Sequence, residues 1–209
     1  MKLARYGEHG EEKPAILDSA GILRDLSGHI EDIGPEALSP DNLSKLTDLN
    51  TCDLPIVPDS ERLGPPVNNI GKLVCIGLNY RLHAQEAGLA IPEEPIIFMK
   101  ATTSLCGPND DVMLPRDSVK SDWEVELTAV IGTHASYVEE DDALDYVAGY
   151  CIANDVSERA FQIEGTGQWV KGKSADTFCP VGPYLVTSDE IPEPPNLSLI
   201  HISEPTRPY

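Results

Sequence analysis

Positive charge is scarce in this sequence. Its 209 residues include 15 Lys and Arg against 35 Asp and Glu, which gives a formal net charge of −20. A surface this acidic repels the phosphates of nucleic acids and the anionic face of membranes, so we exclude both as main partners. An anionic substrate would need local attraction, from a metal ion or from a well-placed Lys or Arg.

Long apolar runs and paired cysteine motifs are absent as well. No stretch approaches the roughly 20 apolar residues needed to cross a bilayer, and residues 1–14 lack the apolar segment of a signal peptide. The five cysteines form an odd number without a Cys-x-x-Cys motif, which favours reduced, buried thiols over a disulfide framework. Hydrophobic residues still make up 41% of the chain. We therefore predict a globular, cytoplasmic protein.

The first part of the chain carries short strand patterns. Three of them predict strands of a small sheet, at residues 3–7, 14–18 and 22–28. A helix is expected to begin at Pro40, with Ser39 as its cap. Residues 53–69 are rich in Pro and Gly, which predicts a connector.

Strand patterns also dominate after residue 72. They lie at residues 73–76, 95–100, 121–132, 147–153 and 183–187. The first of these is apolar throughout and predicts a buried strand. Helical patterns are shorter and lie at residues 80–87, at 141–146 and from Ser157 onward. The pattern predicts a mainly β chain of the α+β class.

The most informative segment is residues 121–132, whose apolar and polar residues alternate. Side chains of a strand point to opposite faces in turn, so Glu124 and Glu126 share one face. The opposite face is apolar and consists of Trp123, Val125, Leu127, Ala129 and Ile131. Two carboxylates this close raise each other's pKa unless a cation joins them, and oxygen ligands suit Mg²⁺, Mn²⁺ or Ca²⁺. The pattern fits a metal site, and it also fits a solvated strand face with two surface glutamates.

Asp155 offers a third carboxylate. It follows the apolar strand pattern at residues 147–153, where a side chain emerges at the rim of a sheet. It also begins the sequence Asp155-Val-Ser-Glu158, which has the spacing of a helix capping box. Two roles are therefore open for Asp155, metal ligand and helix cap.

Candidate cationic and polar side chains follow. Arg159 and Gln162 lie three residues apart and share one face of the expected helix. Arg159 either binds an anionic substrate or forms an ion pair with Asp155 or Glu158 that contributes little. Lys173 lies among small residues before a turn rich in Pro and Gly. It is either a lysine that leans into a cleft or an ordinary loop lysine.

His83 and Glu86 form a second candidate pair. Three residues apart on a helix, both side chains lie on one face. A carboxylate beside an imidazole orients it and shares its proton, which makes a general base for the activation of water. An exposed pair without function is the alternative. The other histidines are expected to be structural or exposed: His9, His29, His134 and His201.

Several motifs, taken in their order along the chain, resemble the catalytic domain of the fumarylacetoacetate hydrolase family. They include GLNYRLHAQE, DWEVELTAVIG, AGYCIANDVSERAFQ and GKSADTFCPVGPYLVT, and they span about residues 72–187. The first 67 residues, with RYG and LRDLSGHI, resemble the small N-terminal lobe of bacterial members. The resemblance implies a mixed β-sandwich roll with a small N-terminal α/β lobe, usually assembled as a homodimer.

The resemblance also implies a role for each candidate residue. The metal-binding carboxylates would be Glu124, Glu126 and Asp155. The water-activating dyad would be His83 and Glu86. The groups that bind substrate and stabilise the developing oxyanion would be Arg159, Gln162 and Lys173.

The end of the chain departs from the family. Family members continue past Leu199 with more strands and a Thr-Gly-Thr-Pro-Gly loop that helps to close the site, whereas this chain ends in IHISEPTRPY. We expect an N-terminal lobe and connector at residues 1–67, a truncated catalytic domain at 68–199 and a non-native tail at 200–209. Missing strands would leave sheet edges unpaired.

Together these expectations predict a metal-dependent hydrolase that cleaves a C–C bond in a small anionic 2-oxo acid, such as an acylpyruvate or a diketo-deoxy sugar acid. The expected metal is Mg²⁺ or Mn²⁺, with Ca²⁺ as a further candidate. One alternative is a lyase, decarboxylase or isomerase that uses the same site on ureidoglycolate or heptadienedioate, because one enolate intermediate serves all of them. The other is an inactive fragment or a binding-only pseudo-enzyme.

Overall fold

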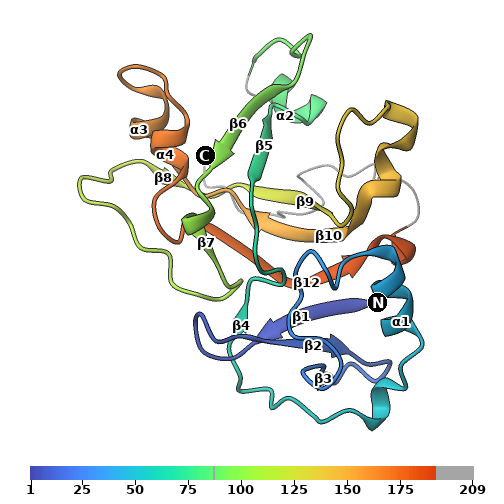
Figure 1. Cartoon of the computed structure of the whole chain (residues 1–209). Helices are drawn as coiled ribbons and strands as arrows, with labels where there is room; N and C mark the ends of the chain where they lie inside the picture. Colours follow the sequence, from blue (N-terminus) through green and yellow to red (C-terminus); the bar gives the residue numbers. More distant parts are fainter. Residues whose placement is uncertain (87, 192–209) are drawn as a thin grey trace.

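The computed structural model describes residues 1–86 and 88–191 (Figure 1). Its largest element is an eight-stranded sheet in the order β3-β2-β1-β12-β10-β9, with β4 beside β1 and β7 beside β12. Two smaller sheets pair β5 with β6 and β8 with β11. The predicted strand-rich α+β class is confirmed, and the tail predicted at residues 200–209 lies outside the described residues.

The N-terminal strands lie close to their predicted positions. They are β1 (Lys2–Tyr6), β2 (Lys13–Leu17) and β3 (Leu23–Asp25). The expectation that they form a small sheet of their own is wrong, because β1 also pairs with β12 (Cys179–Thr187), with Leu3 opposite Leu185. This pairing satisfies one edge of β12, which would otherwise present unpaired backbone groups.

The first helix, α1 (Pro40–Thr47), begins where the sequence predicts. Ser39 is its N-cap residue, but its side chain makes no capping hydrogen bond. The Ser39 hydroxyl instead donates to the Glu36 carbonyl at 2.9 Å. Pro40 therefore starts the helix largely through its fixed φ.

Two long strands complete the main sheet beside β12. β9 (Val125–Ile131) pairs antiparallel with β10 (Val147–Asn154), and β10 pairs antiparallel with β12. The helical turn predicted before β10 is the 3₁₀ helix η3 (Glu140–Tyr146). The apolar face predicted for residues 123–131 is exposed at its two ends, where Trp123 is 41% and Ile131 56% exposed, and half-buried at Val125 and Leu127.

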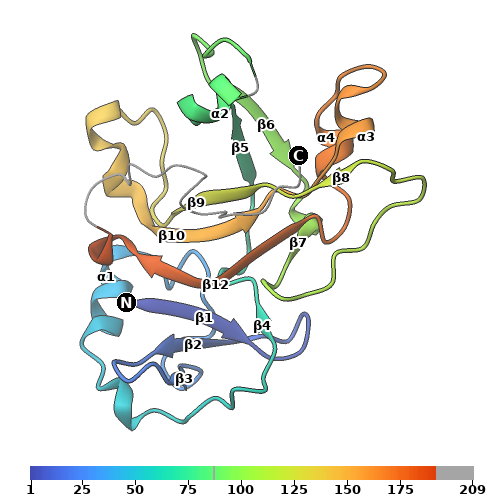
Figure 2. The same cartoon turned by 180° about the vertical axis from the view of Figure 1, so that it is seen from behind.

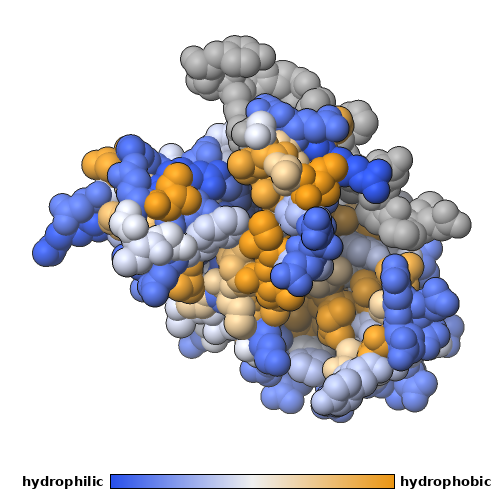
Figure 3. All heavy atoms as spheres, turned by 90° about the horizontal axis from the view of Figure 1, so that it is seen from above, coloured by the Kyte–Doolittle hydropathy of each residue, from blue (hydrophilic) through white to orange (hydrophobic). Residues whose placement is uncertain are grey.

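β5 (Leu73–Gly77) and β6 (Ile96–Lys100) form an antiparallel pair above the main sheet (Figures 1 and 2). The prediction that β5 is a buried strand is wrong, because burial alternates along both strands. One face packs inward, and the other leaves four apolar side chains exposed in the described part of the chain: Val74, Ile76, Ile97 and Met99. Figure 3, which views this end of the molecule, shows apolar side chains gathered in a hollowed region with polar groups around it.

The remaining elements are short. The strands are β4 (Leu63–Gly64), β7 (Leu105–Cys106), β8 (Ser121–Asp122) and β11 (Ser157–Glu158). The helices are α2 (Arg81–Glu86), α3 (Arg159–Ile163) and α4 (Val170–Lys173). The 3₁₀ turns are η1 (Thr51–Asp53), η2 (Thr102–Ser104) and η4 (Ser188–Glu190). Within the described ranges, no helix is both long and apolar enough to cross a membrane.

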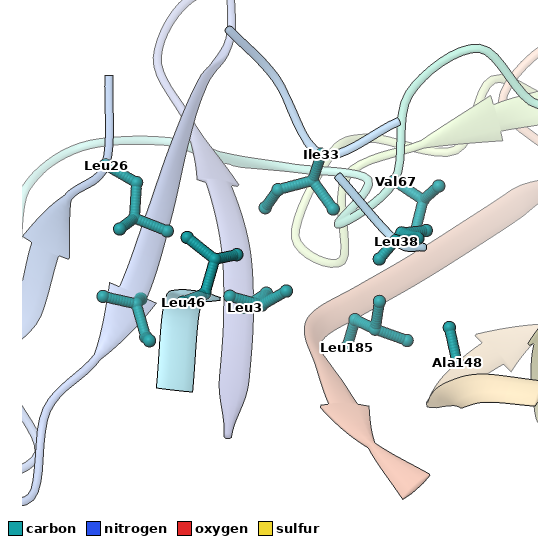
Figure 4. Close-up of a cluster of buried hydrophobic side chains, with 9 residues drawn as sticks. Leu3, Leu26, Ile33, Leu38, Leu46, Val67, Ala148 and Leu185 are labelled. Carbon is teal, nitrogen blue, oxygen red and sulfur yellow. The ribbon is translucent and has the colours of Figure 1, made fainter. Parts of the chain in front are cut away.

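The main hydrophobic core joins the two ends of the described chain. Side chains from the first 67 residues, among them Leu3, Leu38 and Leu46, pack in one cluster with Ala148 of β10 and Leu185 of β12 (Figure 4). A second cluster contains Cys151 and Cys179, whose buried free thiols agree with the prediction. The core thus crosses the expected boundary at residue 67, while the domain limits themselves stay a prediction.

Candidate active site

The ends of β9 and β10 bring three carboxylates to one end of the sheet. Glu124 directly precedes β9 and Asp155 directly follows β10. The Asp155 amide donates to the Glu124 carbonyl at 2.7 Å, so the pairing continues beyond the two strands. Glu126 lies opposite Ala153 in the same ladder. Residues distant in sequence therefore share one edge, as the strand pattern predicts.

Lys173 joins two of these carboxylates. Its Nζ lies 2.7 Å from Oε2 of Glu124 and 2.7 Å from Oδ2 of Asp155, and the residue is 2% exposed. The same ammonium lies 5.1 Å from the centre of the Phe98 ring, within the range of a cation–π contact. Lys173 is therefore buried at the end of the helix Val170–Lys173, while its role in a site stays a prediction.

Lys100, at the end of β6, is a site residue that the sequence analysis missed. Its Nζ lies 2.7 Å from Oδ1 of Asp155 and 3.2 Å from the Val156 carbonyl, and the residue is 2% exposed. The signal was present, since a lysine that closes an apolar strand stands out in a chain with few cations. Each oxygen of Asp155 consequently binds a different lysine.

Glu158, and not Asp155, is the N-cap of α3. Its side chain accepts from the Ala160 amide at 3.2 Å and from the Lys120 amide at 2.9 Å, and it also contacts the Ser118 hydroxyl. Burial alone would raise the pKa of Glu158, but these hydrogen bonds hold the pKa below its usual value. The capping role considered for Asp155 is wrong, which leaves its side chain to the acidic cluster.

Arg159 faces the cluster from the first turn of α3. Its guanidinium contacts Asp122 at 2.8 Å, Gln162 at 3.0 Å and Oε1 of Glu124. Burial favours the neutral form, but the charges of Glu124 and Asp122 outweigh it and raise the pKa of Arg159. The alternative pairing of Arg159 with Asp155 or Glu158 is not formed among the described residues.

Glu126 carries the least compensated charge of the three carboxylates. Burial, followed by the negative charges of Glu124 and Asp155, raises the pKa of Glu126 to about 7. No Lys, Arg or His nitrogen lies within 4.0 Å of its carboxylate in the part of the chain that the structure describes. Burial, followed by the negative charge of Glu126, raises the pKa of the Tyr80 hydroxyl. An additional cation beside Glu126 would thus relieve a real electrostatic cost.

His83 and Glu86 lie on α2, near but not within this cluster. The Ala84 amide donates to the Tyr80 carbonyl at 3.1 Å, so His83 lies about one turn beyond Tyr80, whose pKa the charge of Glu126 raises. His83 is half-buried and Glu86 exposed. No hydrogen bond or ion pair joins the two side chains within residues 1–86 and 88–191. The dyad stays a prediction.

The donor chemistry of the cluster suits a hard divalent cation. Three carboxylates supply only oxygen, and two of them already converge on one cationic nitrogen. Among the described residues, however, no three acidic, His or Cys side chains are arranged as a ready metal cage. In the same cluster, Lys100 and Lys173 contact the two oxygens of Asp155. The three carboxylates therefore supply the kind of ligand that a hard divalent cation requires.

Comparison with known proteins places this strand-rich chain in one family. The sequence profile described as "Fumarylacetoacetate (FAA) hydrolase C-terminal" matches residues 72–202. A Burkholderia orbicola protein, provisionally named a hydrolase, is 55% identical over 199 residues, which cover 95% of this chain and 71% of the relative. The chain belongs to the fumarylacetoacetate hydrolase family.

Solved structures agree with this assignment. Fumarylacetoacetate hydrolase from Exiguobacterium antarcticum has 31% identity and a TM-score of 0.76, over 90% of this chain and 67% of that one. The 5-carboxymethyl-2-hydroxymuconate delta-isomerase from Mycobacterium smegmatis has 30% identity and a TM-score of 0.69, with the same coverage. The family and fold predicted from the sequence are confirmed, whereas the roles of the individual site residues stay predictions.

Proposed function

We propose that this protein is a divalent-cation-dependent hydrolase that cleaves a C–C bond in a small 2-oxo or diketo acid. The observation that carries the proposal is the convergence of Glu124 and Asp155 on one cationic nitrogen, with Glu126 beside them at a raised pKa. Membership of the fumarylacetoacetate hydrolase family supports the reaction type. Small oxo acids are anions, so the surplus of acidic residues makes the cations of the site essential for attraction.

Glu124, Glu126 and Asp155 would hold the cation, Mg²⁺ or Mn²⁺ in the first instance. When bound, the cation supplies Lewis acidity to the oxo-acid end of the substrate and offsets the charge of the carboxylates. The protein itself has to bind the substrate and move the protons. The proposed partners are a small oxo acid as substrate and a second copy of the chain in a homodimer.

Proton transfer would fall to His83 and Glu86. The Glu86 carboxylate would have to turn toward the imidazole to orient it, and His83 would take a proton from a water molecule that attacks the second carbonyl of the substrate. The negative charge that develops on that carbonyl oxygen is stabilised by Arg159, Gln162 and Lys173. Each such donor typically contributes about 3–4 kcal/mol. When the C–C bond breaks, the imidazolium returns the proton to the leaving carbon.

A second candidate function is isomerisation of an unsaturated dicarboxylate. It is favoured by the similarity to a delta-isomerase, which is comparable to the similarity to the hydrolase. Lyase and decarboxylase activities would use the same residues. An assay panel of acylpyruvates, diketo sugar acids, ureidoglycolate and heptadienedioate, each with Mg²⁺ and Mn²⁺, separates these reactions by their products.

The proposal is tested first by cation-dependent melting. Mn²⁺ at 100 times its Kd should raise the free energy of unfolding by about 2.7 kcal/mol, and the Glu126→Gln variant should lose this gain together with turnover. Sodium chloride at matched ionic strength controls for screening of the acidic surface. A wild-type melting temperature that Mg²⁺ and Mn²⁺ leave unchanged would favour an inactive fragment or a binding-only protein and reject the proposal.

A further inference from the structure

Two lysines bind one aspartate in the candidate site. Oδ1 of Asp155 lies 2.7 Å from the Nζ of Lys100, and Oδ2 lies 2.7 Å from the Nζ of Lys173. Both lysines are 2% exposed, so neither ammonium keeps a full hydration shell. One carboxylate needs only one cation for neutrality, and burial of a second is costly unless it has further partners. The further partners of the two lysines therefore show what each lysine does.

The second contacts of the two lysines differ. Lys100 donates to the main-chain carbonyl of Val156 at 3.2 Å and reaches no other carboxylate within the described chain. Lys173 instead reaches Oε2 of Glu124 at 2.7 Å. The ammonium of Lys100 is thus held by the backbone, whereas that of Lys173 lies between two carboxylates from different segments.

We propose that Lys173 is an exchangeable cation: its ammonium holds Glu124 and Asp155 together until a divalent cation takes its place, while Lys100 keeps Asp155 oriented throughout. This inference rests on the proposed function and adds a step to it. A cation that binds both carboxylates must enter the space where the Nζ of Lys173 lies, 2.7 Å from an oxygen of each. Two like charges cannot share that space.

The backbone beside Lys173 is fixed, so exchange requires only its side chain to move. A Cβ on Gly172 would lie 2.4 Å from the Glu158 carbonyl oxygen and 2.6 Å from the Gln162 nitrogen, so α4 is held tightly against α3. The four-carbon stem of a lysine is flexible, and the Phe98 ring beside the ammonium offers a cation–π contact along the way. Displacement would turn the ammonium toward the part of the site that receives the substrate, where it could donate to an oxyanion and would be open to small reagents. Cation binding would therefore prepare Lys173 for its part in the reaction.

The test compares two matched variants, Lys173→Met and Lys100→Met. Each removes one positive charge beside the same Asp155 carboxylate, so an effect of charge alone would strengthen Mn²⁺ binding in both variants, although Lys173 also touches Glu124. Exchange predicts that only Lys173→Met binds Mn²⁺ more tightly, by about tenfold or more, and that Lys100→Met binds it no more tightly than the wild type. Calorimetric titration with Mn²⁺ measures the Kd. Tighter binding in both variants, or unchanged or weaker binding by Lys173→Met, overturns the inference.

A measurement on the wild-type protein covers the case in which a variant does not fold. Lysine amines are labelled with an N-hydroxysuccinimide ester with and without Mn²⁺, and the modified peptides are quantified by mass spectrometry. We expect Mn²⁺ to increase the labelling of Lys173 several-fold and to leave Lys100 protected. Labelling of Lys173 that stays constant while Mn²⁺ binds rejects exchange and leaves the proposed function standing. A wild-type protein that binds neither Mn²⁺ nor Mg²⁺ rejects both.

Discussion

Glu126 shows how one side chain can report on the whole acidic cluster. It is the carboxylate that lacks a cationic partner within 4.0 Å among the described residues, and its pKa of about 7 follows from burial and from Glu124 and Asp155. Glu124, by contrast, contacts both Lys173 and Arg159. Glu124 and Glu126 are only two residues apart, yet we expect their substitution to change stability in opposite directions.

We expect Glu126→Gln to stabilise the metal-free protein at pH 8. The Glu126 carboxyl keeps its proton up to about pH 7 in the folded protein but ionises near 4.5 when unfolded. The free energy of unfolding therefore falls as the pH rises from 4.5 to 7, because only the unfolded protein ionises Glu126 freely in this range. The loss is about 2 kcal/mol after a reduction for solvent screening. Urea denaturation in EDTA at several pH values measures the difference between wild type and variant. Glu124→Gln is the matched control and should destabilise, and a Glu126→Gln variant less stable than wild type at pH 8 would contradict the argument.

His83 carries the second prediction at this scale. The His83→Ala variant should lose the general base and slow turnover by about 10²–10⁴-fold. Its Mn²⁺-dependent rise in melting temperature should remain, because no carboxylate of the cluster changes. His134, which is exposed, provides the control as His134→Ala with full activity. An His83→Ala enzyme that turns over as fast as the wild type would remove His83 from the mechanism.

Much of the site at residue level could be predicted from the sequence. Strand alternation alone placed Glu124 and Glu126 on one face, and the end of an apolar strand offered Asp155 as either a third carboxylate or a helix cap. The partners of these carboxylates could not be predicted, because Lys100 lies 55 residues away from Asp155 and Asp122 lies 37 residues away from Arg159. Contacts over such separations depend on tertiary packing, which local patterns do not encode.

The elements around the site are short and held by close backbone contacts. α3 and α4 lie together beside β8 in both views of the molecule (Figures 1 and 2). Periodicity predicted a helix from Ser157 but could not show that Ser157 and Glu158 form β11 instead. It also could not show that β5 would leave one face exposed, because a short apolar run fits a buried strand equally well.

Gly172 tests the packing of α4 against α3. Gly172→Ala should destabilise the protein by about 1–3 kcal/mol, since the new methyl group would overlap the backbone of Glu158 and Gln162. It should also weaken the contacts of Lys173 by moving α4 away from the site. Thermal melting measures the loss of stability.

The matched control for this substitution is Gly28→Ala. A Cβ on Gly28 would meet nothing within 4 Å, and its φ lies outside the left-handed region. We expect this variant to keep the wild-type melting temperature within a degree or two, because its free energy of unfolding should change by no more than about 0.5 kcal/mol. If the two variants melt alike, the contact between α3 and α4 is looser than the structure indicates.

At the scale of the whole molecule, strand pairing and core packing both cross the boundary that the sequence suggested at residue 67. β1 pairs with β12, and Leu3, Leu46, Ala148 and Leu185 belong to one cluster. The sequence could not reveal this, because a strand pattern predicts a strand but not the strand with which it pairs. The homodimer and the cytoplasmic location stay predictions.

A core shared in this way predicts that residues 1–67 and the rest of the described chain unfold together. Both tryptophans, Trp123 and Trp169, lie outside the first 67 residues, so their fluorescence reports only on the second part. Leu46, 3% exposed in α1, belongs to the shared cluster, and Leu46→Ala should cost about 2–5 kcal/mol. If folding is cooperative, this substitution lowers the midpoint of the tryptophan transition although it lies far from both rings in sequence.

Hydrogen exchange of β1 and β2 should then follow the same denaturant dependence as the fluorescence. A tryptophan midpoint unmoved by Leu46→Ala, with faster exchange confined to β1 and β2, would show that the N-terminal strands unfold by themselves.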